Sequence, residues 1–138
     1  MKVLLDSSAL AKRYIPEKGS DKVMEACRKA DVLGVSVTCY PEVISALCRL
    51  KREKRINSAQ YLSAKQVIAK DLGDFVICNI TENTIARVVS LLEESALRAM
   101  DAFHIAAALD WKCDLFVSSD RGQVKAAGKA GIKACEIS

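Results

Sequence analysis

Short apolar segments alternate along the chain with longer segments that have helical spacing. The short runs are four to six residues long, and their continuous apolar character is typical of strands buried in a parallel sheet. In the longer segments apolar residues recur every three or four positions, as Ile85, Val88 and Leu92 do, and this predicts amphipathic helices. We expect strands at 2–5, 32–37, 75–80, 115–118 and 132–137, and helices at 7–14, 20–30, 38–50, 58–73, after Thr81, at 99–111 and at 122–130.

This alternation predicts an α/β fold, with a central parallel sheet of about five strands and helices on both faces. The length of 138 residues fits a single domain covering 1–138. Asp101 and His104 interrupt the longest apolar stretch before it reaches the ~18 residues of a membrane span. Only three apolar residues follow Met1 and Lys2 before the first acid, so the N-terminus does not resemble a signal peptide. We therefore expect a cytoplasmic protein that does not enter membranes.

Six cysteines are many for this length, but no two of them form a C-x-x-C pair. Most lie inside apolar runs, where reduced thiols serve as small hydrophobic side chains. We therefore interpret the cysteines as free and buried rather than as disulfides or zinc ligands.

Acidic residues that directly follow strands form the most informative pattern. Asp6 follows the strand at 2–5 and Asp120 follows the strand at 115–118, so both belong at the carboxyl edge of the sheet, where ligands bind in such folds. Asp114 precedes its strand and would lie roughly 20 Å from Asp120, at ~3.3 Å per residue. Asp31 also precedes a strand. Asp31 and Asp114 are therefore expected at the opposite edge, away from the site.

Two further acids join this set. Glu42 lies in the first turn of a helix that follows the second strand, and Asp101 lies among apolar residues, where an unpaired charge is costly. Each acid has a simpler explanation, because Asp6, Asp101 and Asp120 could each cap a helix and Glu42 is an ordinary residue for a first helical turn. If the fold brings the four together, they form a cluster of hard oxygen ligands, which binds Mg²⁺ or Mn²⁺ and acts on phosphate esters.

Four segments give the chain a resemblance to the PIN domain, and specifically to the small ribonuclease toxins of the VapC type. Val3-Leu4-Leu5-Asp6-Ser7-Ser8 is similar to the first motif of that family, and Pro41-Glu42-Val43 with Ala46 to the second. The segment 98–108, around Asp101, is a close match to the third motif, and Ser118-Ser119-Asp120-Arg121 resembles the fourth. The chain departs from the family at Gln123-Val124, where many relatives carry a bulky aromatic residue.

The resemblance implies a PIN-like fold and a metal-dependent endoribonuclease that is the toxin of a toxin–antitoxin pair. Its acidic quartet would be Asp6, Glu42, Asp101 and Asp120, which hold one or two Mg²⁺ or Mn²⁺ ions and leave 5′-phosphate and 3′-hydroxyl ends on RNA. The implied partners are RNA, a cognate antitoxin protein and a second copy of the chain, as a homodimer. Supporting roles are expected for Ser7 and Ser118, and RNA phosphate contacts for Lys12, Arg13, Arg49 and Arg52.

Two other functions remain open on the sequence alone. One is a PIN-fold nuclease that processes RNA and is not a toxin; the other is a non-catalytic module of the same fold that binds nucleic acid or protein. Phosphate-binding and nucleophile-elbow motifs are absent from the sequence. His104 lies alone in an apolar helix, so we interpret it as a structural residue rather than a general base.

Overall fold

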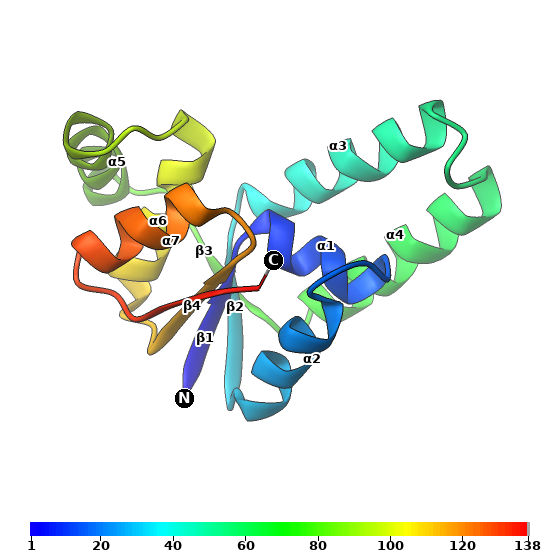
Figure 1. Ribbon diagram of the computed structural model, residues 1–138, viewed down its shortest axis with the longest axis horizontal. Coiled ribbons are helices and arrows are strands. Elements are labelled where there is room, and N and C mark those ends of the chain that lie inside the picture. Colours follow the sequence, from blue (N-terminus) through cyan, green and yellow to red (C-terminus); the bar gives the residue numbers. More distant parts are fainter. Residues whose placement is uncertain (138) are drawn as a thin grey trace.

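The computed structural model describes residues 1–137, which form a five-stranded parallel sheet with helices on both faces (Figure 1). The α/β fold expected from the alternating pattern is confirmed. The strands are β1 (Lys2–Leu5), β2 (Val32–Ser36), β3 (Val76–Cys78), β4 (Leu115–Ser118) and β5 (Ala134–Glu136). The helices are α1 (Ser7–Tyr14), α2 (Ser20–Lys29), α3 (Cys39–Arg52), α4 (Ser58–Leu72), α5 (Glu82–Glu94), α6 (Ala99–Trp111) and α7 (Arg121–Lys129).

The sheet separates two hydrophobic cores, because successive side chains of a strand point to opposite faces. Val3 and Leu5 of β1 pack with α1, α2, α3 and α4, whereas Leu4 packs with α5, α6 and α7. All three side chains are fully buried. Burial on both faces explains why the strand sequences read as continuous apolar runs rather than as alternating ones.

The strand order is β3-β2-β1-β4-β5, so β1 lies at the centre of the sheet. From β1 the chain builds the sheet outward on one side and then returns to build the other side from β4. Leu5 of β1 pairs with Val117 of β4, which places the carboxyl ends of these two strands next to each other. This is the switch point at which open α/β sheets bind their ligands.

The sequence favours Ser20 and Ser58 as the cap residues of the helices at 20–30 and 58–73, but other residues occupy the cap positions, and one strand is shorter than predicted. Gly19, not Ser20, is the residue before α2, and its φ of 94° is one that glycine adopts without strain. Asn57, not Ser58, caps α4: its side chain accepts the Gln60 N–H at 2.7 Å, and Gln60 Oε1 accepts the Asn57 N–H at 2.8 Å. Strand β3 is three residues long rather than six.

Each of the six cysteines, all of which lie in the described residues, is unpaired. Cys39 is buried and the other five are half-buried. Within residues 1–137, no helix combines the length and the apolar character needed to cross a lipid bilayer.

Candidate active site

Asp6 and Ser118 meet where β1 and β4 end side by side. The Ser118 hydroxyl donates to Asp6 Oδ2 at 2.6 Å, and both side chains are fully buried. Asp6 Oδ1 accepts two more hydrogen bonds, from Ser8 Oγ at 2.7 Å and from the Ala9 N–H at 2.9 Å. Asp6 therefore caps helix α1 and also faces the carboxyl edge of the sheet, so the capping role and the site role coexist.

Burial raises the pKa of Asp6, because removal from water penalises the ionised carboxylate. The hydrogen bond from Ser118 opposes that rise in pKa, and the nearby His104 and the donors Ser8 and Ala9 oppose it further. A carboxylate held by three donors at the end of a central strand has little freedom to turn. Its direction is therefore fixed before any ligand arrives.

Asp120 is joined to Asp6 through Ser118. The same Ser118 hydroxyl that donates to Asp6 accepts the Asp120 N–H at 2.9 Å. The Asp120 carboxylate accepts the Gln123 N–H at 3.0 Å and so caps α7. As with Asp6, one residue both caps a helix and stands at the switch point.

Asp101 reaches the site from α6. It is the third residue of that helix, which begins at Ala99 after Arg98, so Asp101 is not a helix cap. Its carboxylate accepts hydrogen bonds from Gln123 Nε2 at 3.0 Å and from Arg98 Nε at 3.2 Å. These two donors make the burial of this carboxylate tolerable among its apolar neighbours.

Glu42 is held by His104 across the carboxyl edge of the sheet. Glu42 Oε1 lies 2.5 Å from His104 Nε2, which joins α3 to α6. His104 is fully buried, and its Nδ1 atom has no hydrogen-bond partner among the described residues. Sequence reasoning treated His104 as structural and did not pair it with Glu42, because nothing in the sequence signals a contact between residues 62 positions apart.

The positive charge of the exposed Arg98 guanidinium interacts with the negative charges of three of the acids. The hydrogen bond to Asp101 raises the pKa of Arg98, and the negative charges of Asp120 and Glu42 add to that rise. His104, the partner of Glu42, in turn opposes the rise in the pKa of Asp6. Side-chain contacts and charge interactions thus connect all four predicted carboxylates at one edge of the sheet.

Asp31 and Asp114, the two acids expected at the opposite edge of the sheet, lie at that edge. Asp31 pairs with the N-terminal amino group of Met1, and Asp114 accepts the Lys2 N–H at 2.7 Å. Met1 and Lys2 lie at the amino end of β1, opposite the end that leads to Asp6.

The donor set fits a hard divalent cation, because carboxylate oxygens are the ligands that Mg²⁺ and Mn²⁺ prefer. Among residues 1–137 no three acidic, histidine or cysteine side chains stand close enough together to surround a metal ion. The carboxylates are instead occupied by hydrogen-bond donors of the chain: Ser118, Gln123, Arg98 and His104. A cation would therefore have to replace these donors at the carboxylate oxygens.

The other predicted residues take no part in the contacts that hold the four carboxylates, and Arg13 lines a hollow with Asp31 and Val32, at the opposite edge of the sheet. Ser7 begins α1, and its predicted supporting role stays a prediction, whereas its neighbour Ser8 contacts Asp6. Lys12 pairs with Glu17 at 3.0 Å, and Arg13 lies 3.5 Å from Asp71. The remaining two basic residues, Arg49 and Arg52, are exposed in the last turn of α3.

Cys39 lies beside the site, at the start of α3. Burial raises the pKa of its thiol well above the ordinary value, and the charges of Asp6 and Glu42 add to this rise. The thiol is therefore neutral at physiological pH and serves as a small apolar side chain.

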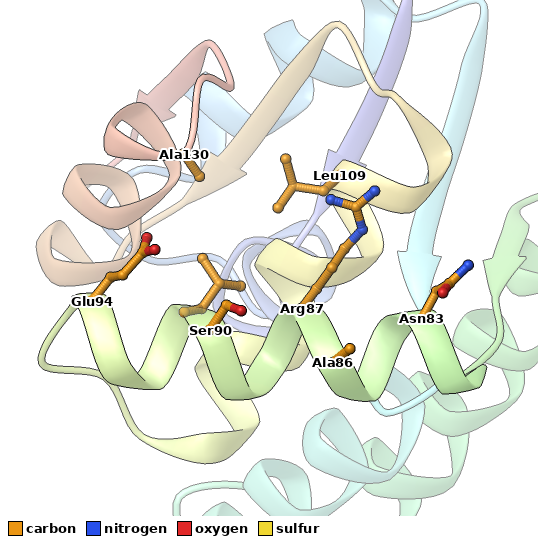
Figure 2. Close-up of a pocket in the computed structure, with 8 residues that line it drawn as sticks. Asn83, Ala86, Arg87, Ser90, Glu94, Leu109 and Ala130 are labelled. Atoms are coloured by element: carbon orange, nitrogen blue, oxygen red, sulfur yellow. The ribbon is translucent and has the colours of Figure 1, made fainter.

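A hollow on the surface lies elsewhere in the molecule. It runs along α5 from Asn83 to Glu94 and is bordered by Leu109 and Ala130 (Figure 2). None of the four carboxylates lines it. The acidic cluster is thus separate from this hollow.

The model of the PIN domain family matches residues 3–129, and the chain belongs to that family. This confirms the resemblance carried by the four sequence motifs. A toxin–antitoxin complex from Klebsiella pneumoniae has the same fold, at 20% identity over 99% of this chain and 98% of that one, with a TM-score of 0.71. No curated protein sequence matches the chain.

Two further solved structures have the same fold. FitAcB from Neisseria gonorrhoeae is 14% identical over 96% of this chain and 95% of that one, with a TM-score of 0.70. VapC20 from Mycobacterium tuberculosis, described as a sarcin-ricin loop cleaving toxin, is 15% identical over 94% of this chain and 95% of that one, with a TM-score of 0.69. At these identities the similarity establishes a common fold.

Proposed function

We propose that this protein is a Mg²⁺- or Mn²⁺-dependent endoribonuclease and the toxin of a toxin–antitoxin pair. The observation that carries the proposal is the set of contacts connecting Asp6, Glu42, Asp101 and Asp120 at the switch point of the sheet. Membership of the PIN domain family and the fold shared with toxin–antitoxin proteins support it.

Asp6, Asp101 and Asp120 would hold the metal directly or through water, and Glu42 would be a ligand or would orient the attacking water. A bound Mg²⁺ or Mn²⁺ lowers the pKa of water and neutralises charge that develops on a phosphodiester. Attack of water on phosphorus with departure of the 3′-oxygen leaves a 5′-phosphate and a 3′-hydroxyl.

The residues of the chain supply orientation and charge. Ser118 fixes Asp6 through its hydroxyl and fixes the backbone of Asp120 through the same oxygen atom. His104 holds Glu42 in place from a fully buried position. Exposed Arg49 and Arg52 lie about 10 and 15 Å along α3 from Glu42, at 1.5 Å per residue, where they would attract the phosphates of RNA.

The partners follow from the same proposal. A cognate antitoxin protein would bind the toxin and block access to the acidic cluster, and two copies of the chain would form a homodimer. The Klebsiella pneumoniae structure, a toxin–antitoxin complex of the same fold, supports an antitoxin partner. The cytoplasm, where RNA substrates and antitoxin are made, is the proposed location.

The test is cleavage of end-labelled total RNA by purified, antitoxin-free protein in Mn²⁺ or Mg²⁺. Discrete products are expected in metal and not in EDTA, and Asp101→Asn should abolish them. Asp114→Asn is the matched control, because it changes the same residue type at the opposite edge of the sheet and should leave cleavage intact.

The outcome also separates the alternatives. Cleavage restricted to one precursor RNA, without growth arrest on expression, would favour a processing nuclease. If the folded protein leaves all RNA intact in both metals over a wide concentration range, the nuclease proposal fails and a non-catalytic binding module of the same fold takes its place.

A further inference from the structure

Helix α7 begins with a residue pattern that forms a capping box elsewhere in this chain. In such a box, the third helical residue donates its N–H to the cap side chain and returns its own side chain to the N–H of the cap residue. Gln60 completes the box with Asn57 at the start of α4, and Thr84 completes one with Thr81 at the start of α5. Asp120 and Gln123 occupy the same two positions at the start of α7.

The box at α7 is only half formed. The Gln123 N–H donates to Asp120 Oδ1 at 3.0 Å, as expected. The Asp120 N–H, however, donates to Ser118 Oγ at 2.9 Å, which leaves the Gln123 side chain free to go elsewhere. It turns to α6 and donates from Nε2 to Asp101 Oδ1 at 3.0 Å.

In this orientation the side-chain oxygen of Gln123 lacks a hydrogen-bond partner among residues 1–137. The residue is 4% exposed, and its Oε1 atom is buried with no hydrogen-bond partner among residues 1–137. Because Asp101 Oδ1 accepts this hydrogen bond, the amide presents its nitrogen to Asp101, and its oxygen is the atom left without a partner among residues 1–137. Neither helix capping nor the satisfaction of its own polar atoms explains the side-chain position, whereas the contact with Asp101 does.

One residue thus donates to two carboxylates that belong to different elements. Its backbone N–H holds Asp120 at the start of α7, and its side chain holds Asp101 on α6. The two helices pack against each other (Figure 1). A change at Gln123 would alter the position of Asp101 relative to Asp120 without removing either ligand.

We propose that Gln123 is a positioning residue that sets Asp101 and Asp120 for a shared divalent cation, an inference that rests on the metal-dependent function proposed above. The unpartnered Oε1 belongs to the same amide group whose Nε2 donates to Asp101. Hydrogen-bonding partners that orient metal-binding side chains change metal affinity by about 10–100-fold when they are removed.

The experiment measures Mn²⁺ binding to the metal-free protein by calorimetry, with electron paramagnetic resonance of free Mn²⁺ as a second readout and without RNA. Gln123→Leu keeps the approximate volume and removes both the donor and the unpartnered oxygen. We expect its Kd for Mn²⁺ to rise about 10–100-fold, with far-UV circular dichroism unchanged. Gln60→Leu is the matched control: it breaks a complete capping box, so it should lower Tm and leave the Kd for Mn²⁺ unchanged.

A second variant keeps the size of the side chain and reverses its hydrogen bonding. Gln123→Glu places a carboxylate against Asp101 in place of the amide donor. We expect the metal-free variant to have a lower Tm than the wild type, and added Mn²⁺ to raise that Tm by more than it raises the wild-type Tm, because the cation relieves the repulsion.

The outcomes separate this inference from the nuclease proposal. If Gln123→Leu binds Mn²⁺ as tightly as the wild type, or if Gln123→Glu matches the wild type in Tm and in its response to Mn²⁺, Gln123 only packs and the positioning role is overturned. If the wild type binds Mn²⁺ and Gln123→Leu weakens binding, but neither cuts RNA, the positioning role stands and the nuclease proposal fails. A wild-type protein that binds no Mn²⁺ at millimolar concentration overturns both.

Discussion

Replacement of Gly19 by alanine is expected to be among the most destabilising small changes in this chain. Gly19 has a φ of 94°, and a Cβ atom added there would lie 1.9 Å from the Ile137 carbonyl oxygen. That oxygen belongs to the backbone, so no side-chain rotation relieves the clash. Ile137 is fully buried, and its N–H donates to the Ser118 carbonyl oxygen at 3.1 Å. A shift of Ile137 would therefore disturb the strand end that carries Ser118.

The magnitude has two parts. A non-glycine residue at positive φ costs about 1–2 kcal/mol, and forced overpacking costs about 1–3 kcal/mol more, so Gly19→Ala should lose roughly 2–5 kcal/mol of the free energy of unfolding. Domains of this size have about 5–15 kcal/mol in total. At roughly 3–5 °C per kcal/mol, the expected fall in Tm is about 6–25 °C.

Two other glycines separate the two contributions. Gly131 has the same φ of 94°, but no atom lies within 4 Å of its added Cβ, so Gly131→Ala should cost only the ~1–2 kcal/mol of backbone strain. Gly128 is helical and has open space around it, so Gly128→Ala should be neutral or stabilising by up to about 1 kcal/mol. Urea unfolding followed by circular dichroism measures all three. If Gly19→Ala costs no more than Gly131→Ala, the close approach to Ile137 plays no part and the reasoning is refuted.

Three further predictions concern the site and the sheet beneath it. Burial raises the pKa of Asp6, so the contribution of Asp6 to stability is fully present below the unfolded pKa, ~3.9, and is lost as pH rises through the folded pKa. Asp6→Asn should therefore raise Tm at pH 7–8. Melting curves at a series of pH values should show this gain in Tm vanishing towards pH 4. A gain of equal size at every pH would contradict that assignment. Ser118→Ala removes the 2.6 Å hydrogen bond to Asp6 and should cost about 1.5–3 kcal/mol in urea unfolding, and a loss below 0.5 kcal/mol would show that the bond contributes little. Gly34→Ala would place a Cβ atom 2.6 Å from Trp111 Cζ3 and should cost about 1–3 kcal/mol while shifting the fluorescence of the single tryptophan; an unchanged spectrum and stability would argue against close packing of this ring on β2.

The strand pattern predicted on which edge of the sheet four aspartates lie, because this placement depends on few physical rules. Continuous apolar runs identify buried parallel strands, and a residue that follows such a run lies at the carboxyl edge whatever the detailed packing. Asp6 and Asp120 follow from this reasoning, as does the placement of Asp31 and Asp114 at the other edge.

Contacts that hold the acids could not be predicted in this way. The pairing of Glu42 with His104 and of Asp101 with Gln123 depends on how α3, α6 and α7 sit on the sheet and on the side-chain rotamers they allow. The D-x-x-Q pattern at Asp120 even favours a capping box, which Ser118 prevents by taking the Asp120 N–H. The prediction of the cap residues of α2 and α4 was wrong for a related reason. Adjacent residues such as Asn57 and Ser58 are both good caps, and only the backbone conformation selects one of them.

The bond between Glu42 and His104 joins the two hydrophobic cores that the sheet separates. Glu42 precedes Val43 of the core shared by α1–α4, and His104 precedes Ile105 of the core shared by α5–α7. The four acids therefore share one environment only while both halves of the molecule are folded. A chain with one core formed and the other open would carry every acid and still lack the contact between Glu42 and His104, so the proposed site would be complete only when both cores have folded.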